Sequence, residues 1–330
     1  MGHSTRPVEH HGFTRPRFCC LLWLTHVDGS DCVAPTASVV LRTSLDSLGA
    51  LNAASATRGP HLHATVAVTD TSVPSGVLRG ACTAPAVKDP EDKRTSAEIP
   101  IDEKKTYLWI EGLRDCTTIA ATMPQTEIVC VIDREADFFK LFDAWRQDPR
   151  TELVVRADHN RCTSGDLKLF DAVKASEPQV VFSLYLKRQS ARPKRSKQQA
   201  RPVRPERTAK MTSRYCRIAL RPPSTHPEKE PLALWIIHAV EAKPAEGEKP
   251  IEWFLLTTKE VNAPEQVRTI LEWYRLRWRA QSAHADHPVR GCRSLRSAPR
   301  GTGFLRVSSD RHGKLVSPYS PPGSGSQRRR

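Results

Sequence analysis

The feature that most constrains this chain is residues 127–139, where an unbroken apolar run ends at a carboxylate. Residues 128–132 read Ile-Val-Cys-Val-Ile, which is typical of a strand buried on both faces of a sheet. Asp133 follows, and apolar residues then recur at helical spacing from Phe138 to Trp145. Carboxylates at the ends of such strands commonly bind ligands. The alternative is that Asp133 only caps the helix.

The surrounding segments predict an α/β fold, a mixed sheet with helices on its faces. Upstream and just downstream of the central strand, we predict strands at 62–68 and 76–80 forming an antiparallel hairpin, an exposed loop at 85–100, a helix at 101–113 and a short buried strand at 152–156. Further along, we predict strands at 180–186, 215–220, 232–240 and 252–258, and a helix at 264–279.

Residues 187–217 form a strongly basic stretch. They contain twelve lysines and arginines, Lys194, Arg195 and Lys197 among them, against the single acid Glu206. Such charge density cannot be buried in a core. It can neutralise several phosphates by counterion release, so we predict that this stretch contacts DNA. The alternative is a solvated basic loop.

Composition narrows the classes of partner and location. The 330 residues include 51 Lys and Arg against 36 Asp and Glu, a net charge of +15, which favours nucleic acid first and an acidic membrane surface second. No apolar run approaches the roughly 18 residues of a membrane span. Nine cysteines without a Cys-x-x-Cys pair argue against a zinc module or a disulfide scaffold, and for the cytoplasm.

Three separate stretches together resemble the insertion-sequence-four family of DDE transposases, over about residues 58–280. They are Asp-Arg-Glu-Ala-Asp at 133–137, the apolar strand beginning at Trp253, and Tyr274-x2-Arg277-Trp278 on the late helix. The resemblance implies an RNase H-like core at 58–160, an inserted β-rich basic subdomain at 161–250 that contacts DNA, and a return strand and signature helix at 251–281. Residues 1–57 and 282–330 lack a sustained period, so we expect both ends to be poorly ordered.

The resemblance also implies a chemistry. In this family two Mg²⁺ (or Mn²⁺) ions, held by three acids, support phosphodiester hydrolysis and strand transfer at transposon ends. Asp133 matches the second acid, a catalytic residue and metal ligand. Trp253 matches a tryptophan that stacks on an unstacked base, and Tyr274 and Arg277 match residues that grip the DNA backbone. Arg156, His159 and Arg161 are expected to face the DNA too. The implied partners are double-stranded DNA, at transposon ends and target, and a second copy in a homodimer.

Two of these roles have a simpler alternative, and several positions depart from the family pattern. Trp253 could be strand core, and Tyr274 could belong to the apolar face of its helix. The signature glutamate is replaced by Gln281 and the signature lysine by Pro288.

The first acid is also missing. Leu41 occupies its expected place, and Asp46 is the nearest carboxylate. We hypothesise that both ends are read out of frame, which predicts a Glu-containing helix in another frame after codon 280. The sequence therefore predicts a transposase by descent with impaired catalysis or, alternatively, a catalytically inactive DNA-binding remnant.

Overall fold

The computed structural model describes residues 17–26, 61–71, 73–83, 91–95, 98–186, 188, 191 and 203–286, and two short strands at 308–309 and 315–316. The strands are β1 (Arg17–His26), β2 (His61–Thr69), β3 (Pro74–Thr83), β4 (Glu127–Ile132), β5 (Glu152–Arg156), β6 (Val180–Leu186), β7 (Arg207–Leu220), β8 (Leu232–Glu241), β9 (Glu252–Thr257), β10 (Ser308–Ser309) and β11 (Leu315–Val316). The helices are η2 (Ile101–Glu103), α1 (Tyr107–Thr122), η3 (Arg134–Ala136), α2 (Phe139–Gln147), α3 (Leu169–Ala175) and α4 (Pro264–Asp286).

Nine of these strands form one mixed sheet in the order β3-β2-β1-β4-β5-β9-β8-β7-β6. The strands β3, β2 and β1 form an antiparallel meander, and β4 and β5 run parallel to β1. The remaining strands are antiparallel to their neighbours from β5 outward. The predicted mixed sheet with flanking helices is therefore confirmed, and the strands within 161–250 continue it.

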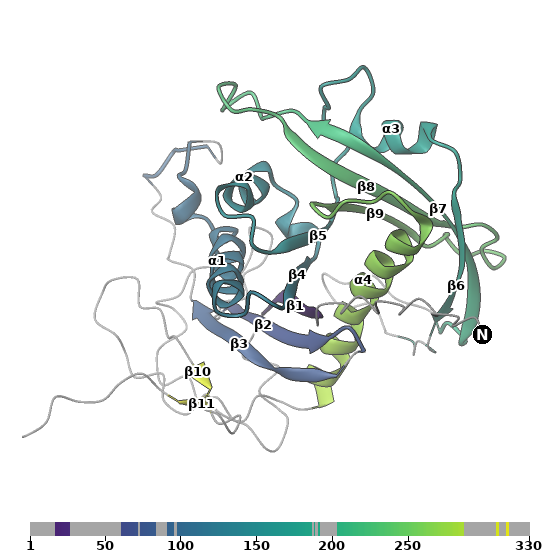
Figure 1. The fold of residues 1–330 in the computed structure, drawn as a ribbon, viewed down its shortest axis with the longest axis horizontal. Helices are drawn as coiled ribbons and strands as arrows, with labels where there is room; N and C mark the ends of the chain where they lie inside the picture. The colour runs from purple at the N-terminus through teal and green to yellow at the C-terminus, as the bar shows by residue number, and fades with distance from the viewer. Residues whose placement is uncertain are drawn as a thin grey trace, which may run out of the picture.

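Helices cover both faces of the sheet, and β4 lies between them. Its residues 128–132 are all at most 2% exposed. Ile128, Cys130 and Ile132 pack into a core with α1, α2 and α3, whereas Val129 and Val131 pack into a second core with α4. Figure 1 shows β4 and β5 with α1 and α2 on one side and α4 on the other. Burial on both faces explains why this strand is continuously apolar.

Four features differ from the sequence-based expectations. Strand β1 lies within the segment for which we predicted no regular structure. Its uncharged run forms a strand because it pairs with β2 on one side and β4 on the other. The helix predicted from 101 begins as the short 3-10 turn η2, and α1 itself starts at Tyr107. The basic stretch is a strand from Arg207 onward. Helix α4 continues to Asp286, past the expected start of the tail at 282.

The short helix α3 was not predicted, since seven residues with only Leu169 and Val173 fully buried give little helical periodicity. Several predictions fall outside the described residues: the positions of Leu41 and Asp46, the DNA contacts of Lys194, Arg195 and Lys197, and the place of Pro288.

Candidate functional site

Asp133 lies immediately after β4, with its backbone extended (φ −86°, ψ −179°). Although it is the first residue before the turn η3, its side chain makes no capping hydrogen bond. Its Oδ2 instead accepts a hydrogen bond from Arg277 Nη2 of α4. Its Oδ1 is buried without a hydrogen-bond partner among the described residues. The capping alternative for Asp133 is therefore wrong, and the carboxylate faces α4.

Helix α4 contributes two residues that the motif predicted. Tyr274 and Arg277 are three positions apart and so lie on one face of the helix. The Tyr274 ring packs edge-on against Trp253 of β9, with ring centroids 5.5 Å apart. Trp253 and Tyr274 are 7% and 0% exposed, so both are core residues in this structure. Burial raises the pKa of the Tyr274 hydroxyl, and the charge of Asp133 raises it further.

Arg156 completes this group at the end of β5. It pairs in register with Leu255 of β9, two residues from Trp253, which places it on the α4 side of the sheet. Its Nη2 lies 3.5 Å from the Glu252 carbonyl oxygen, and the side chain is half-buried. We call these residues the Asp133 cluster: Asp133, Arg156, Trp253, Tyr274 and Arg277. With two arginines and one carboxylate, the cluster carries a net charge of +1 and suits an anionic group such as a phosphate.

A second carboxylate of the motif, Asp137, has a different role. Its side chain is fully buried and accepts hydrogen bonds from the backbone N–H groups of Asp158 (2.7 Å) and His159 (3.2 Å). It also forms an ion pair with Arg161. The guanidinium of Arg161, expected to face DNA, is thus engaged inside the protein, whereas His159 is exposed. Sequence reasoning missed Asp137, although its place in the Asp-Arg-Glu-Ala-Asp motif was a signal.

Few possible metal ligands surround Asp133 among the residues that the structure describes. In these residues no group of three or more His, Cys, Asp or Glu side chains could hold a metal ion. Asp133 shares one of its oxygens with Arg277. The adjacent strand β1 runs parallel to β4, with Leu21 opposite Val131, and its ten residues include no carboxylate. Hard cations such as Mg²⁺ need several oxygen ligands, and the cluster offers one carboxylate.

Part of the basic stretch is neutralised within the fold. Arg207 of β7 forms ion pairs with Glu241 and with Glu248, the latter at 3.1 Å. Its neighbour Arg204 pairs with Glu248 at 3.2 Å. The hydrogen bond from Arg207 lowers the pKa of the Glu241 carboxyl. These two arginines therefore have protein partners, while Lys210 and Arg217 of the same strand are exposed.

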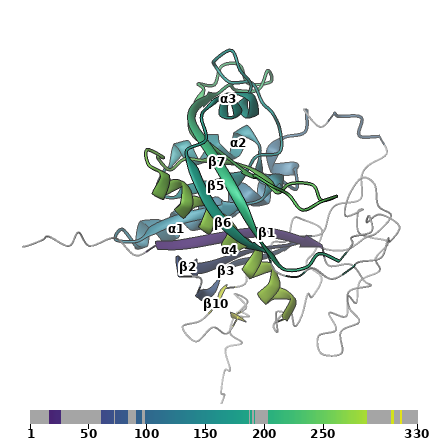
Figure 2. The ribbon, with the colours of Figure 1, turned by 90° about the vertical axis from the view of Figure 1, so that its right-hand side faces the viewer.

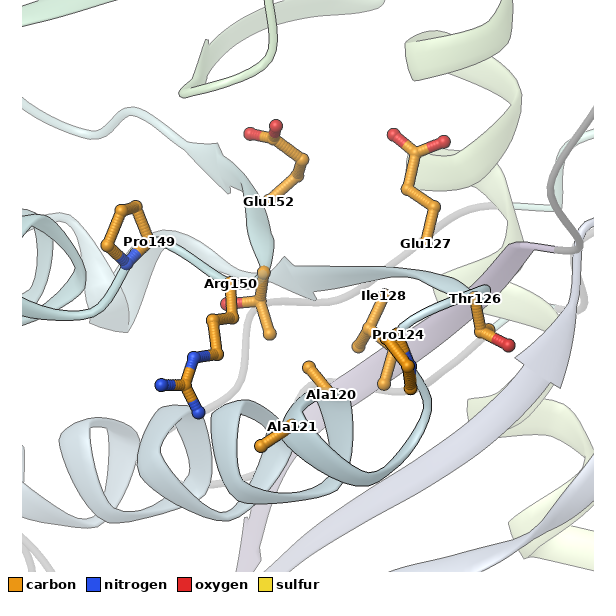
Figure 3. A pocket seen from close by; sticks show the side chains of 10 residues that line it. Ala120, Ala121, Pro124, Thr126, Glu127, Ile128, Pro149, Arg150 and Glu152 are labelled. Carbon is orange, nitrogen blue, oxygen red and sulfur yellow. The ribbon is translucent and has the colours of Figure 1, made fainter.

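A hollow of the described surface lies at the other end of the central strands. It has a volume of about 680 Å³ and is lined by the amino ends of β4 and β5 and by the end of α1. Figure 3 shows Glu127 and Glu152 pointing to one side of it and Arg150 to the other. Glu127 forms an ion pair with Lys259, and the Thr258 hydroxyl donates to Glu152 at 2.5 Å. This hollow is separate from the Asp133 cluster, which lies at the carboxyl end of β4.

No model of a known protein family matches the chain. Of the helices that the structure describes, none has the length and apolar character needed to cross a membrane.

Proposed function

We propose that this chain is a DNA-binding protein descended from insertion-sequence transposases of the DDE kind, in which cleavage and strand transfer are impaired. One observation carries the proposal. Asp133, Trp253 and the Tyr274–Arg277 pair come from three separate segments that meet in one cluster. More than a hundred residues separate Asp133 from Trp253, and the rest of β9 and a loop separate Trp253 from α4. These are the positions that carry the family resemblance, and their convergence is what a shared site requires.

The topology supports the same descent. The order β3-β2-β1-β4-β5, with an antiparallel meander followed by two parallel strands, agrees with the RNase H-like arrangement that the resemblance implies. Asp133 ends the fourth strand of this series, and α4 covers the face toward which Asp133 points. The additional strands β9, β8, β7 and β6 extend the sheet, and the last three lie in the stretch expected to be an inserted β-rich subdomain.

Impairment follows from the acids that are present. Gln281 stands at the sequence position of the signature glutamate, four residues beyond Arg277. A neutral amide there cannot replace an anionic ligand. The expected place of the first acid is occupied by Leu41. Of the three acids, Asp133 is thus the one with a clear match in the sequence, and its charge is balanced by Arg277. Mg²⁺ or Mn²⁺ chemistry of the intact family is therefore not expected to proceed efficiently here.

The net positive charge of the chain and the exposed part of Arg156 in the Asp133 cluster both support DNA binding. The chain carries a net charge of +15, and Arg156 is a half-buried cation at the rim of the Asp133 cluster. In this proposal Arg156 contacts a backbone phosphate, and the basic stretch adds further contacts. Arg277 contacts the DNA only if a phosphate replaces Asp133 as its partner.

Binding of the purified full-length chain to a labelled DNA duplex, followed by fluorescence anisotropy over a range of salt concentrations, tests the proposal. We expect log K to fall linearly with log[salt]. Arg156→Ala should weaken binding about three- to tenfold and reduce the slope by about one. Arg150→Ala is the matched control, because Arg150 lies just before the opposite end of β5, is well exposed and pairs with Asp148. Equal effects of both substitutions, or no binding, would overturn the proposal.

The second candidate, a catalytically inactive remnant, is favoured by the Asp133–Arg277 ion pair. Nicking of supercoiled plasmid with and without Mg²⁺ separates the two readings. Slow nicking that disappears in Asp133→Asn would indicate an impaired transposase. Binding without nicking would indicate the remnant.

A further inference from the structure

The nine-stranded sheet ends at β6 (Val180–Leu186). Among the described strands its single partner is β7, from Val180–Ser213 to Leu186–Arg207 without a register shift. In Figure 1 β6 and β7 lie at the right-hand margin, and in Figure 2 they run across the front. The outer edge of such a strand presents a row of backbone N–H and C=O groups that can pair with another strand.

The opposite edge of the same sheet is protected against pairing. Strand β3 contains Pro74, and its register with β2 shifts twice. Its Arg79 points inward, where it pairs with Glu111 (2.7 Å) and Asp115 (3.0 Å) of α1. Proline, bulges and inward-pointing charges are the devices by which natural proteins block edge-to-edge association.

Strand β6 has none of these devices. Its sequence, Val-Val-Phe-Ser-Leu-Tyr-Leu, contains no proline, glycine or charged residue. Burial alternates along it: Val180 and Leu184 are buried, whereas Val181 and Tyr185 are 51% and 52% exposed. The Tyr185 hydroxyl donates a hydrogen bond to Glu206 at 2.9 Å. The edge is thus largely apolar and rich in residues that favour β-structure.

The strand is also complementary to itself. If two copies of β6 pair antiparallel about Ser183, Val181 of each copy lies opposite Tyr185 of the other. Aromatic and β-branched residues are a favourable cross-strand pair. The same register brings the amino end of one strand beside the carboxyl end of the other. Glu177, just before β6, then stands near Arg188 of the second copy, and both residues are exposed.

We propose that β6 is the interface of a homodimer, in which two copies pair through this edge with two-fold symmetry and join their sheets into one. The contact is isologous and closed, so it ends at two copies. Its occupant is a second copy of this chain, because register, apolar face and end charges are each self-complementary. The proposal does not depend on DNA binding or on transposase descent.

Sedimentation of the full-length chain over a range of concentrations tests the proposal. We expect the mass to rise from one copy to two. Ser183→Lys sets two ammonium groups directly opposite each other at the two-fold axis and should raise the dimer Kd at least tenfold. Ser75→Lys is the matched control, because Ser75 is an exposed serine on the other edge strand, β3. A single copy at all concentrations, or equal weakening by both variants, would overturn the proposal.

A charge swap provides the test if Ser183→Lys fails to fold by circular dichroism. Glu177→Arg should weaken the dimer, and adding Arg188→Glu should restore it. If neither change alters the Kd, the proposed register is wrong. Pairing of β6 with a different protein or with DNA would leave the chain as a single copy in isolation, which also contradicts the homodimer.

Discussion

At the scale of single residues, the Asp133–Arg277 pair is the contact on which the cluster depends. The Arg277 side chain is 6% exposed and the Asp133 side chain 31% exposed. We predict that Arg277→Ala lowers the free energy of unfolding by about 2 kcal/mol, because Asp133 Oδ2 loses its donor while Oδ1 already lacks one. The loss is smaller than for a fully buried pair because water screens the exposed third of Asp133. Urea denaturation measures it.

A double-mutant cycle provides the control for this pair. The cycle compares Asp133→Asn, Arg277→Met and the variant that carries both substitutions. The free energy of unfolding lost in the double variant should be smaller than the sum of the losses in the two single variants. Strict additivity would mean that the two side chains are not coupled.

His63 of β2 makes a separate prediction about pH. It is fully buried, both ring nitrogens lack hydrogen-bond partners among the described residues, and it packs edge-on against Trp109 with centroids 4.7 Å apart. Burial lowers its pKa from 6.5 to about 3, helped by the positive charges of Arg79 and Lys105. Between these values the unfolded chain binds a proton that the folded chain does not. Stability is therefore retained above pH 6.5 and lost as the pH falls toward 3.

The loss attributable to His63 amounts to at most about 5 kcal/mol by linkage. We expect His63→Leu, which fills similar space without a titrating group, to unfold at a lower pH than the unsubstituted chain. Acid titration followed by circular dichroism compares the two. Identical acid midpoints would show that His63 does not titrate on unfolding.

Motif reasoning could find these residues one by one but could not find their contacts. The roles predicted for Asp133, Trp253, Tyr274 and Arg277 came one by one from the family resemblance. The pairing of Asp133 with Arg277 spans 144 positions and depends on how α4 crosses the sheet, which no local pattern determines. For the same reason Arg161 was predicted to face DNA, although the fold pairs it with Asp137.

At the scale of elements, Asp137 joins two connections of the chain. It follows η3, and its oxygens hold the backbone at 158–159 and the guanidinium of Arg161, just after β5. We predict that Asp137→Ala costs about 3–5 kcal/mol, because it leaves a largely buried cation and two amides without their acceptor. Asp137→Asn keeps an acceptor oxygen and should cost less. Urea denaturation gives the cost, and faster amide exchange at 158–161 gives its location. Unchanged exchange there would contradict the role.

The predictability of each element follows from how much signal it carries. Unbroken runs of apolar residues identified β4 and β5, and the alternation of residue types along 62–68 identified β2. Strand β1 was missed because a short apolar run among residues without a period gives no evidence of its partners, and its place depends on β2 and β4. Strand β7 was predicted too short because its basic residues suggested a loop. The fold accommodates them by pairing Arg207 with Glu241 and exposing Lys210.

At the scale of the whole molecule, the added strands and the first five share one core. Ile132 of β4 and Ile236 of β8 are both fully buried in the cluster that contains α1, α2 and α3. Strand β9 connects the two halves by pairing with β5 on one side and β8 on the other. In the part of the chain that the structure describes, the strands of residues 161–250 therefore belong to the same sheet as the first five.

This arrangement predicts one cooperative unfolding transition. Because the same core supports β4 and β8, breaking either exposes apolar surface of the other. In amide exchange at increasing urea, the opening free energies of peptides from β4 and β8 should merge into one transition. At concentrations where the chain is a single copy, peptides from β6 should open earlier, since among the described strands β6 pairs only with β7. If β8 opened several kcal/mol below β4, residues 161–250 would be an independent folding unit, and the common core would contribute little to holding the halves together.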